Sequence, residues 1–349
     1  VTKDSKTSDG AGIGTFVSTM TQLTANTPYY VRAYATNEAG TGYGEELTFT
    51  SGDVSLATVT TVIVDQITTT TARSGGNITS DGGGTITEMG VCWTTSSTTA
   101  PTRDANDHTT DSGTGSFVSN IQPLLPGTTY YVRAYAKNSA GVAYGEKFMF
   151  TTDVLDADGN SYNAVTIGNQ IWFGENLKTT KLNDNTPIDN VTDNAAWAAL
   201  NTPGYCWYNN NLSNKDVYGG LYNWYAVNTG KLCPAGWHVP SDAEWTILAD
   251  FLGGATVAGG KMKETGITHW MDPNTGATNE SSFTGLPGGY RNFDGIFSGR
   301  TGNGNWRSST SDVAKPGFAW YRYIYNYAGN IYRSSGNNEG GFSVRCLKD

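Results

Sequence analysis

This chain of 349 residues contains few charged residues, and their scarcity argues against several functions. Only 15% of the residues are charged, the net charge is −9, and no cluster of Lys and Arg occurs. This balance argues against nucleic acid or an anionic membrane surface as a partner. No apolar run approaches the ~18 residues of a membrane-spanning helix, so we expect no insertion into a membrane.

Histidine is rarer still, with only His108, His238 and His269. None of them has the spacing of a metal-binding motif. No Gly-x-Ser-x-Gly motif marks a nucleophile, and the acidic residues form no distinctive pair for glycoside hydrolysis. We therefore predict a protein that is not an enzyme, with no catalytic residue, no metal site and no cofactor.

One short segment could instead form a calcium-binding site. Asp156-x-Asp158-Gly159-Asn160 places oxygen ligands at alternate positions, as calcium loops do. The segment lacks the distal Glu of such loops, and the same residues also form an ordinary turn. We favour the turn.

Cysteine is also sparse, with four residues in the whole chain. Four cysteines permit one or two bridges, but they do not make a disulfide-dense scaffold. Cys92 lies in a predicted central strand, and Cys206 lies between Tyr205 and Trp207. We expect both to be buried thiols.

Glycine, Thr, Ser and Asn are abundant instead, as in extracellular β-rich proteins, and an internal repeat accompanies them. Tyr29–Ala35 recurs as Tyr130–Ala136 and Phe16 recurs as Phe117, at a constant offset of 101 residues. This period is typical of β-sandwich domains, and the alternation in Tyr130–Ala136 is typical of a strand. We predict a partial repeat over 1–52 and a sandwich domain over 54–153.

The segment Leu124-x-Pro126-Gly127-Thr128-x-Tyr130 resembles the corner before strand F of fibronectin type III domains. The resemblance implies that Tyr130 and Tyr29 are corner tyrosines with hydroxyls bonded to nearby backbone. Only the second half of the pattern is present before residue 52, so we expect an exposed sheet edge and an open core there. The chain begins at Val1 inside this repeat; we expect a longer exported protein, or a strand partner from elsewhere.

Residues after Thr152 are richer in Trp and Asn, and they predict hairpins and short helices. Val165–Ile167 and Gln170–Phe173 are separated by two turn residues, as in a β-hairpin. Ser241 and Glu244 form a capping box before apolar residues at helical spacing, which predicts a helix over 241–252. Two further helices are expected over 193–200 and 220–227.

Several motifs in this part resemble the Fibrobacter succinogenes major paralogous domain, a secreted bacterial module of C-type-lectin-like fold. The residues that carry the resemblance, which covers 154–349, are Gly168–Trp172, Glu175–Leu177, Tyr205–Asn210, Tyr218–Trp224, Leu232–Trp245, Leu286–Arg291 and Gly341–Cys346. It implies a mostly β (α+β) fold with short helices, and a disulfide between Cys233 and Cys346. Arg307 departs from the family's usual Trp-Trp-Ser-Ser pattern.

The segment from Tyr290 to Asn338 concentrates Tyr, Trp, Arg, Asn and Ser, the residues that dominate recognition surfaces. We expect its Asn and Arg side chains to be exposed, and Trp320, Tyr323 and Phe342 to be strand core. The predicted ligand-binding residues are Arg291, Asn303, Asn305, Trp306, Arg307, Tyr321, Tyr325, Asn326, Tyr327 and Tyr332. Arg307 and Tyr325 are the expected anchors.

These observations predict a secreted or cell-surface binding protein, an adhesin or receptor-binding module. Fibronectin-like repeats form a stalk, and the C-terminal domain binds a glycan or a protein on another surface. Two alternatives stay open. One is a structural subunit of an extracellular assembly, and the other is an enzyme of the formylglycine-generating type, which shares the lectin-like fold but requires a reactive cysteine pair.

Overall fold

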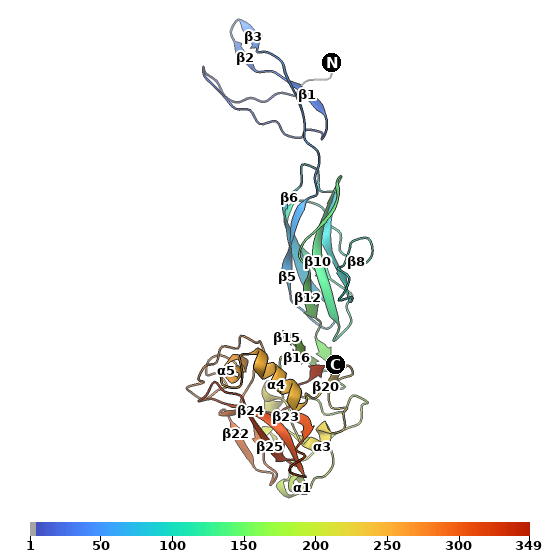
Figure 1. The fold of residues 1–349 in the computed structure, drawn as a ribbon, viewed down its shortest axis with the longest axis vertical. Helices are drawn as coiled ribbons and strands as arrows, with labels where there is room; N and C mark the ends of the chain where they lie inside the picture. The colour runs from blue at the N-terminus through green and yellow to red at the C-terminus, as the bar shows by residue number, and fades with distance from the viewer. Residues whose placement is uncertain (1–4) are drawn as a thin grey trace. The chain divides into compact units, whose positions relative to one another are not determined.

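The computed structural model describes residues 5–349, and strands dominate it (Figure 1). The helices are few and short, and the longest, α4, comprises the ten residues Asp242–Phe251. None of the helices within residues 5–349 combines the length and the apolarity needed to cross a membrane. The predicted fold class, mostly β with short helices and with β-sandwich repeats, is confirmed.

The described chain separates into two compact units. The first contains the residues up to Asp65 with Arg73–Ile121 and Tyr131–Met149, and the second contains Gln66–Ala72, Gln122–Tyr130 and Phe150–Asp349. These limits do not coincide with those of the sequence repeat, and the predicted domain boundaries stay a prediction.

Two sheets form the sandwich of the second repeat. Its strands are β5 (Thr58–Asp65), β6 (Ala72–Ser80), β7 (Glu88–Thr94), β8 (Asp107–His108), β9 (Gly115–Ile121), β10 (Thr129–Asn138), β11 (Gly141–Tyr144) and β12 (Phe148–Thr151). One sheet has the order β5-β6-β9 and the other has the order β8-β7-β10-β11, with β12 also paired to β10. Val91 and Cys92 of β7 and Val132 and Tyr135 of β10 are fully buried, so Cys92 is the buried thiol that its strand predicts.

The first repeat has the same strand pattern displaced by 101 residues. Its strands are β1 (Pro28–Val31), β2 (Tyr34–Asn37), β3 (Gly40–Tyr43) and β4 (Leu47–Thr50), paired as β1-β4 and β2-β3. The hydroxyl of Tyr29 accepts a hydrogen bond from the backbone N–H of Thr24 at 2.7 Å. The hydroxyl of Tyr130 does the same with Leu125 at 3.0 Å, which confirms both corner tyrosines.

The apolar side chains of the first repeat are uncovered. Phe16 is 55% exposed, whereas its equivalent Phe117 is 8% exposed. Residues 5–53 contain no strands equivalent to β5, β6 and β7, and the face that these strands cover in the second repeat is therefore open. A strand partner for this face stays a prediction.

The C-terminal part contains small sheets and short helices. Its strands are β13 (Val154–Leu155), β14 (Ser161–Tyr162), β15 (Ala164–Ile167), β16 (Gln170–Phe173), β17 (Asp189–Asn190), β18 (Gly204–Cys206), β19 (Leu221–Tyr222), β20 (Trp237–His238), β21 (Gly288–Arg291), β22 (Phe297–Arg300), β23 (Asn303–Ser311), β24 (Phe318–Tyr325), β25 (Tyr332–Asn337) and β26 (Leu347–Lys348). Its helices are α1 (Asn194–Ala198), α2 (Lys215–Tyr218), α3 (Trp224–Val227), α4 and α5 (Ala258–Met262), with 3-10 turns η1 (Tyr208–Asn210) and η2 (Leu212–Asn214).

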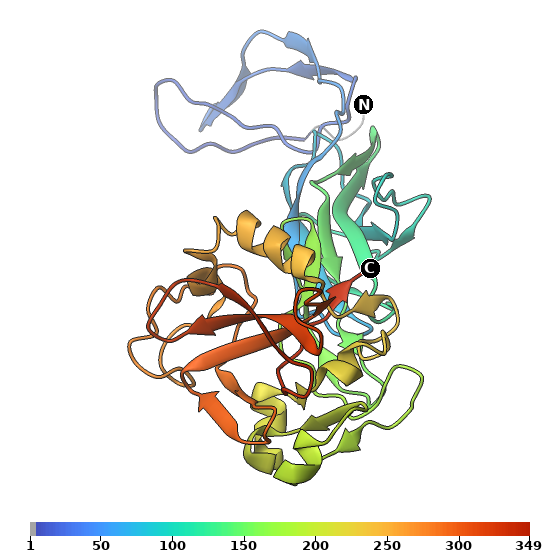
Figure 2. The ribbon, with the colours of Figure 1, turned by 60° about the horizontal axis from the view of Figure 1, so that its bottom comes forward.

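Helix α4 packs against β23 and β24 and contributes buried side chains to the core of the C-terminal part (Figure 2). Its capping box is present, because Ser241 Oγ accepts from Glu244 N–H while the Glu244 carboxylate accepts from Ser241 N–H. Trp245 is fully buried beside Trp172 of β16, with ring centroids 4.8 Å apart, and beside Trp306 of β23, at 6.3 Å. The hairpin β15-β16 and the α1 helix also lie where predicted, whereas the predicted helix over 220–227 is replaced by β19 followed by α3.

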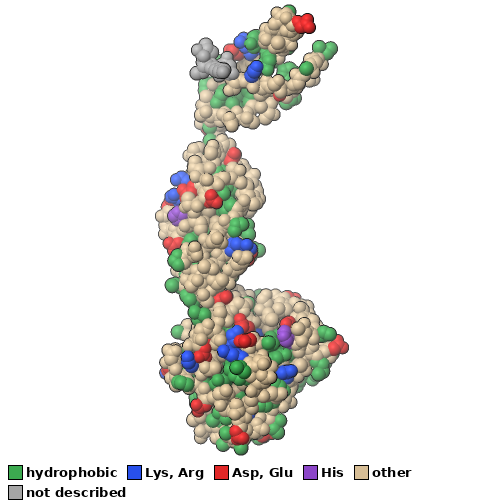
Figure 3. All heavy atoms as spheres, turned by 180° about the vertical axis from the view of Figure 1, so that it is seen from behind, with side chains coloured by type: hydrophobic (Ala, Val, Ile, Leu, Met, Phe, Trp, Pro, Cys, Tyr) green, Lys and Arg blue, Asp and Glu red, His purple; other side chains and the backbone are tan. Residues whose placement is uncertain are grey.

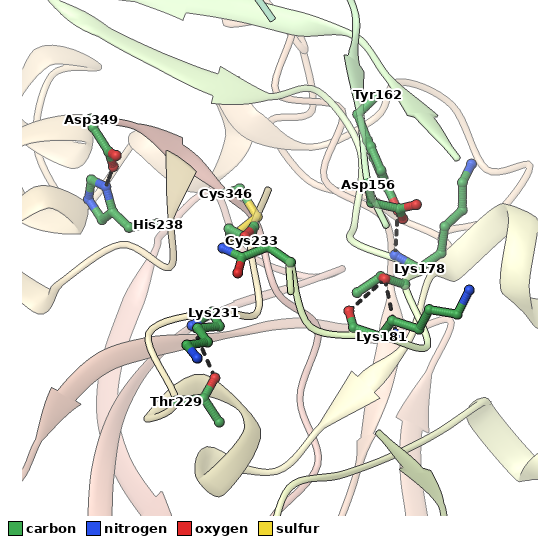
Figure 4. Close-up of a disulfide and its surroundings, with 12 residues drawn as sticks. Asp156, Tyr162, Lys178, Lys181, Thr229, Lys231, Cys233, His238, Cys346 and Asp349 are labelled. Carbon is green, nitrogen blue, oxygen red and sulfur yellow. Dashed lines mark hydrogen bonds and ion pairs between the residues drawn. A yellow bond between two sulfur atoms is a disulfide. The ribbon is translucent and has the colours of Figure 1, made fainter. Parts of the chain in front are cut away.

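The predicted disulfide between Cys233 and Cys346 is present (Figure 4). It links the segment before β20 to the segment before β26, 113 residues later. Close to it, the turn at Asp156 is closed by hydrogen bonds from the N–H groups of Asp158 and Asn160 to the Asp156 carboxylate. The Lys181 ammonium lies 3.1 Å from the Asp158 carboxylate. The donors around these carboxylates fit the turn that we favoured over a calcium loop.

We predict that the first repeat exchanges its backbone amide hydrogens faster than the second repeat. Its strands pair only two at a time over an open face, so local opening costs less free energy. Native-state hydrogen exchange with mass spectrometry on the 349-residue chain should find β1–β4 exchanged well before β7 and β10. Equal protection of the two repeats in a monomeric sample would contradict this.

We also predict that non-reducing peptide mapping recovers a peptide joining Cys233 to Cys346, while Cys92 and Cys206 react with thiol reagents only after unfolding. A link of this span removes conformational entropy from the unfolded chain, and its reduction should lower the unfolding free energy of the C-terminal part by up to about 5 kcal/mol. Free thiols at both linked positions in oxidised protein would show that the pairing is wrong.

Candidate functional site

The sheet β23-β24-β25 presents two different faces. Successive residues of a strand point to opposite sides, and Arg322 and Ile324 of β24 are buried on the side of α4. Tyr321, Tyr323 and Tyr325 alternate with them and are only partly buried. One side of the sheet therefore completes the core, and the other side carries a row of tyrosines.

The rings of this row contact one another continuously. Tyr323 lies 5.5 Å from Tyr321 and 5.3 Å from Tyr325, measured between ring centroids. Tyr332 of β25 stacks on Tyr323 at 5.1 Å, and Tyr327 stacks on Tyr325 at 4.7 Å. We call Tyr321, Tyr323, Tyr325, Tyr327 and Tyr332 the tyrosine face.

The hydroxyl groups of Tyr321, Tyr323 and Tyr325 stay protonated at neutral pH. Burial raises the pKa of Tyr325 to about 12. Burial also raises the pKa values of Tyr321 and Tyr323. Each of these three rings therefore offers a neutral O–H group that can both donate and accept a hydrogen bond.

Arg307 of β23 lies beside Tyr321 on the same side of the sheet. It pairs with Tyr321 in the sheet, but its side chain is fully buried and lies 4.3 Å from the ring centroid of Phe342. The guanidinium donates to four carbonyl oxygens, those of Ala319, Gly336, Asn337 and Gly340. Burial lowers the pKa of Arg307 to about 9, which still leaves it charged at neutral pH. Arg307 therefore binds the segment after β25 to the sheet.

Lys263 and Asn326 hold the turn between β24 and β25. The buried Lys263 ammonium donates to the carbonyl oxygens of Thr275, Tyr325 and Ala328 at 2.7–3.1 Å. The Asn326 amide donates to the carbonyl oxygen of Asp272 at 3.0 Å. The backbone on both sides of Tyr327 is thus bonded to loops that lie far away in the sequence.

The structure separates the predicted binding residues into two groups. Tyr321, Tyr325 and Tyr332 are partly buried at the surface, Tyr327 is exposed, and Asn303 is partly buried opposite Tyr325. These five lie together on one side of the sheet.

The other predicted residues are buried, and the expectation that the Asn and Arg positions are exposed is wrong for them. Trp306 belongs to the core, and its indole N–H donates to Asn176 at 2.8 Å. Arg291 donates to the carbonyl oxygens of Val191, Thr192 and Gly295. The buried residues of the predicted set are Arg291, Asn305, Trp306, Arg307 and Asn326. Their polar groups are used inside the protein, so they do not reach a ligand at the surface.

Tyr323 belongs to the face although its sequence position suggested strand core. It is partly exposed and contacts three other members of the row. The spacing of Tyr321, Tyr323 and Tyr325 by two residues contains the signal, since it places all three on one side of a strand. Phe342, also expected in the core, is buried.

Within residues 5–349, no group of three or more His, Cys, Asp or Glu side chains is placed to hold a metal ion. His238 lies between Asp349 and Glu244, and His269 pairs with Glu264 elsewhere in the fold. On the side drawn in Figure 3, acidic and basic groups are interspersed without a large region of one sign.

A family model confirms the family resemblance of the C-terminal part. The model of the Fibrobacter succinogenes major domain matches residues 165–348, more than half of the chain. No curated protein matches the chain.

Several solved structures resemble stretches of the chain. The sensor domain of the anti-sigma factor RsgI4 from Pseudobacteroides cellulosolvens is 18% identical, with 29% of this chain and 97% of that one covered and a TM-score of 0.23. Domains FN1–FN3 of chicken CNTN1 are 18% identical over 37% and 44% of the two chains, with a TM-score of 0.25. Domains d3–d4 of rat CD45 are 14% identical over 43% and 78%, with a TM-score of 0.26. Similarity at this level carries no argument about function.

We predict that Arg307→Ala lowers the unfolding free energy by at least about 3 kcal/mol, because it removes four buried hydrogen bonds to carbonyl oxygens and leaves a cavity. Nine of the ten Trp residues lie in 154–349, so tryptophan fluorescence during urea unfolding reports on this part. Arg333→Ala in β25 is the matched control. The Arg333 side chain is 44% exposed and pairs with Asp242, and its loss should cost below about 1 kcal/mol. Equal costs for the two variants would place the Arg307 guanidinium at the surface.

Proposed function

The chain belongs to the family of the Fibrobacter succinogenes major domain, and we propose that it is a secreted or cell-surface binding protein without catalytic activity. Its C-terminal domain binds the ligand on the tyrosine face. The β-sandwich repeats carry this domain as a stalk. The tyrosine face is the single observation on which the proposal rests.

Tyrosine suits this role for physical reasons. The ring offers a large contact area while only two side-chain torsions are ordered on binding, and the hydroxyl group adds a directional hydrogen bond. Here the rings already contact one another, and the turn that carries Tyr327 is bonded from below by Lys263 and Asn326. A surface that is ordered before binding loses less entropy when the ligand arrives.

The cysteines favour binding over the alternative of a formylglycine-generating enzyme. Such an enzyme requires a reactive cysteine pair, and reactivity requires an accessible thiolate. Cys346 is linked to Cys233, and burial raises the pKa of Cys206 to about 12. The two thiols that are free among the described residues, Cys92 and Cys206, are both buried.

The disulfide also supports the extracellular location. Disulfides persist in oxidising compartments and are rare in the cytosol. The low content of charged residues and the turn-rich β structure are typical of exported proteins. An adhesin or receptor-binding role fits this location and the proposed division into stalk and binding domain.

We predict that Tyr325→Ala and Tyr332→Ala each weaken ligand binding by about 1–3 kcal/mol, the range found for binding hot spots. Both rings are partly exposed, so the melting temperature should change little. Glycan arrays and screens of cell-surface proteins with the 349-residue chain supply the ligand. Phe251→Ala is the control, because Phe251 is a 63% exposed aromatic residue of α4 outside the tyrosine face. Binding that is unchanged in both tyrosine variants, or that maps to the sandwich repeats, would contradict the proposal.

A further inference from the structure

We infer that the ligand of the tyrosine face is a neutral polysaccharide chain, bound along β24 across several sugar residues. This inference rests on the proposed binding function and adds the chemical class of the ligand. Three features carry it, namely the lack of an accessible charged side chain on the tyrosine side of β23, β24 and β25, the hydrogen-bonding groups that the face offers, and its length.

The first feature is the lack of available charge. On the side of the sheet that carries the tyrosines, β23 contributes Asn303, Asn305 and Arg307. The Arg307 guanidinium is fully buried and donates to four carbonyl oxygens, so it offers no charge to a ligand. On the same side, β25 contributes Tyr332, Ser334 and Gly336, which are uncharged.

The charged side chains of β24 and β25 lie on the opposite side. Arg322 donates to the Asp242 carboxylate at 2.8 Å, and Arg333 pairs with the same carboxylate at 2.8 Å. Arg333 also lies over the Trp320 ring, 3.4 Å from its centroid. An anionic or cationic ligand on the tyrosine face would lose hydration without gaining a counter-charge, which is unfavourable. A ligand without charge avoids this loss.

The second feature is the match between the groups of the face and those of a sugar. Sugar hydroxyls both donate and accept hydrogen bonds, as do protonated tyrosine hydroxyls, and the amide of Asn303 adds one acceptor and two donors. Sugar rings also have apolar C–H faces that stack on aromatic rings. Tyr327 is 59% exposed and stacks on Tyr325 with an angle of 15° between the ring planes. Its other side is thus available to such a ring.

The third feature is the length of the row. Tyr321, Tyr323 and Tyr325 follow one another at every second residue of β24, which corresponds to about 13 Å of strand. Tyr327 continues the row beyond the strand end. A single sugar would contact one or two of these rings, whereas a chain of sugars would contact several, up to Tyr321, where Phe342 packs on the row. The face therefore favours a polymer over a monosaccharide.

Affinity electrophoresis of the 349-residue chain tests the inference directly. The probes are neutral polysaccharides (a glucan, a mannan and a xylan) and charged ones (polygalacturonate, dextran sulfate and chitosan). At least one neutral polysaccharide should retard the chain to an extent that high salt does not reduce. Tyr325→Ala and Tyr332→Ala should each weaken this retardation about tenfold or more, whereas Phe251→Ala should not. A hexasaccharide of the same sugar should compete at least about tenfold better than the monosaccharide.

Tyr325→Phe separates loss of contact from loss of folding, because it keeps the ring and removes only the hydroxyl. It should bind more strongly than Tyr325→Ala and should melt at the wild-type temperature. If no neutral polysaccharide retards the chain while the tyrosine variants lose binding to a protein or to a charged polysaccharide, the inference is overturned and the proposed function stands. If no ligand depends on Tyr325 or Tyr332, both are overturned.

Discussion

Positive charge that is buried without a carboxylate partner constrains the whole C-terminal part. Arg291, Arg307 and Arg345 are fully buried, and no acidic side chain forms an ion pair with any of them within residues 5–349. Each donates instead to carbonyl or side-chain amide oxygens and lies over an aromatic ring. Leaving such a group without partners would cost several kcal/mol, so the segments that supply the oxygens are held in place.

The tyrosine face depends on this arrangement. Arg345 donates to Asn176 at 2.7 Å, and the same Asn176 oxygen accepts from the indole of Trp306 at 2.8 Å. Trp306 stands next to Arg307 in β23, and Arg307 binds the segment that follows β25. Hydrogen bonds therefore connect the core to the sheet, and the sheet to the segment after β25. The loss of any one of these bonds would leave a buried polar group unpaired. An ordered row of rings at the surface is the result.

Local patterns in the sequence predicted much of the fold. The capping box before α4, the hairpin β15-β16 and the two corner tyrosines each need only a few neighbouring residues, and all are present. The pairing of Cys233 with Cys346 came from the family resemblance and not from local pattern. The prediction that Arg307, Asn305 and Asn326 are exposed was wrong, because residue type indicates exposure only on average. The oxygens that satisfy Arg307 come from two strands and a later loop, and no spacing in the sequence shows that they will surround it.

The buried cations Arg307 and Lys263 are bound by main-chain oxygens, which leaves the side chains of the residues that supply these oxygens free to vary among related proteins. Every amino acid supplies a carbonyl oxygen, so Asn337, Ala328 and Thr275 can be exchanged for other residues while Arg307 and Lys263 keep their partners. Gly340 is an exception, because a side chain there would meet the Phe342 ring at 2.9 Å and the Arg307 guanidinium at 3.3 Å. The groups that hold the framework together are thus main-chain atoms, and paralogues built on this fold are free to diverge in their surface side chains without losing that framework.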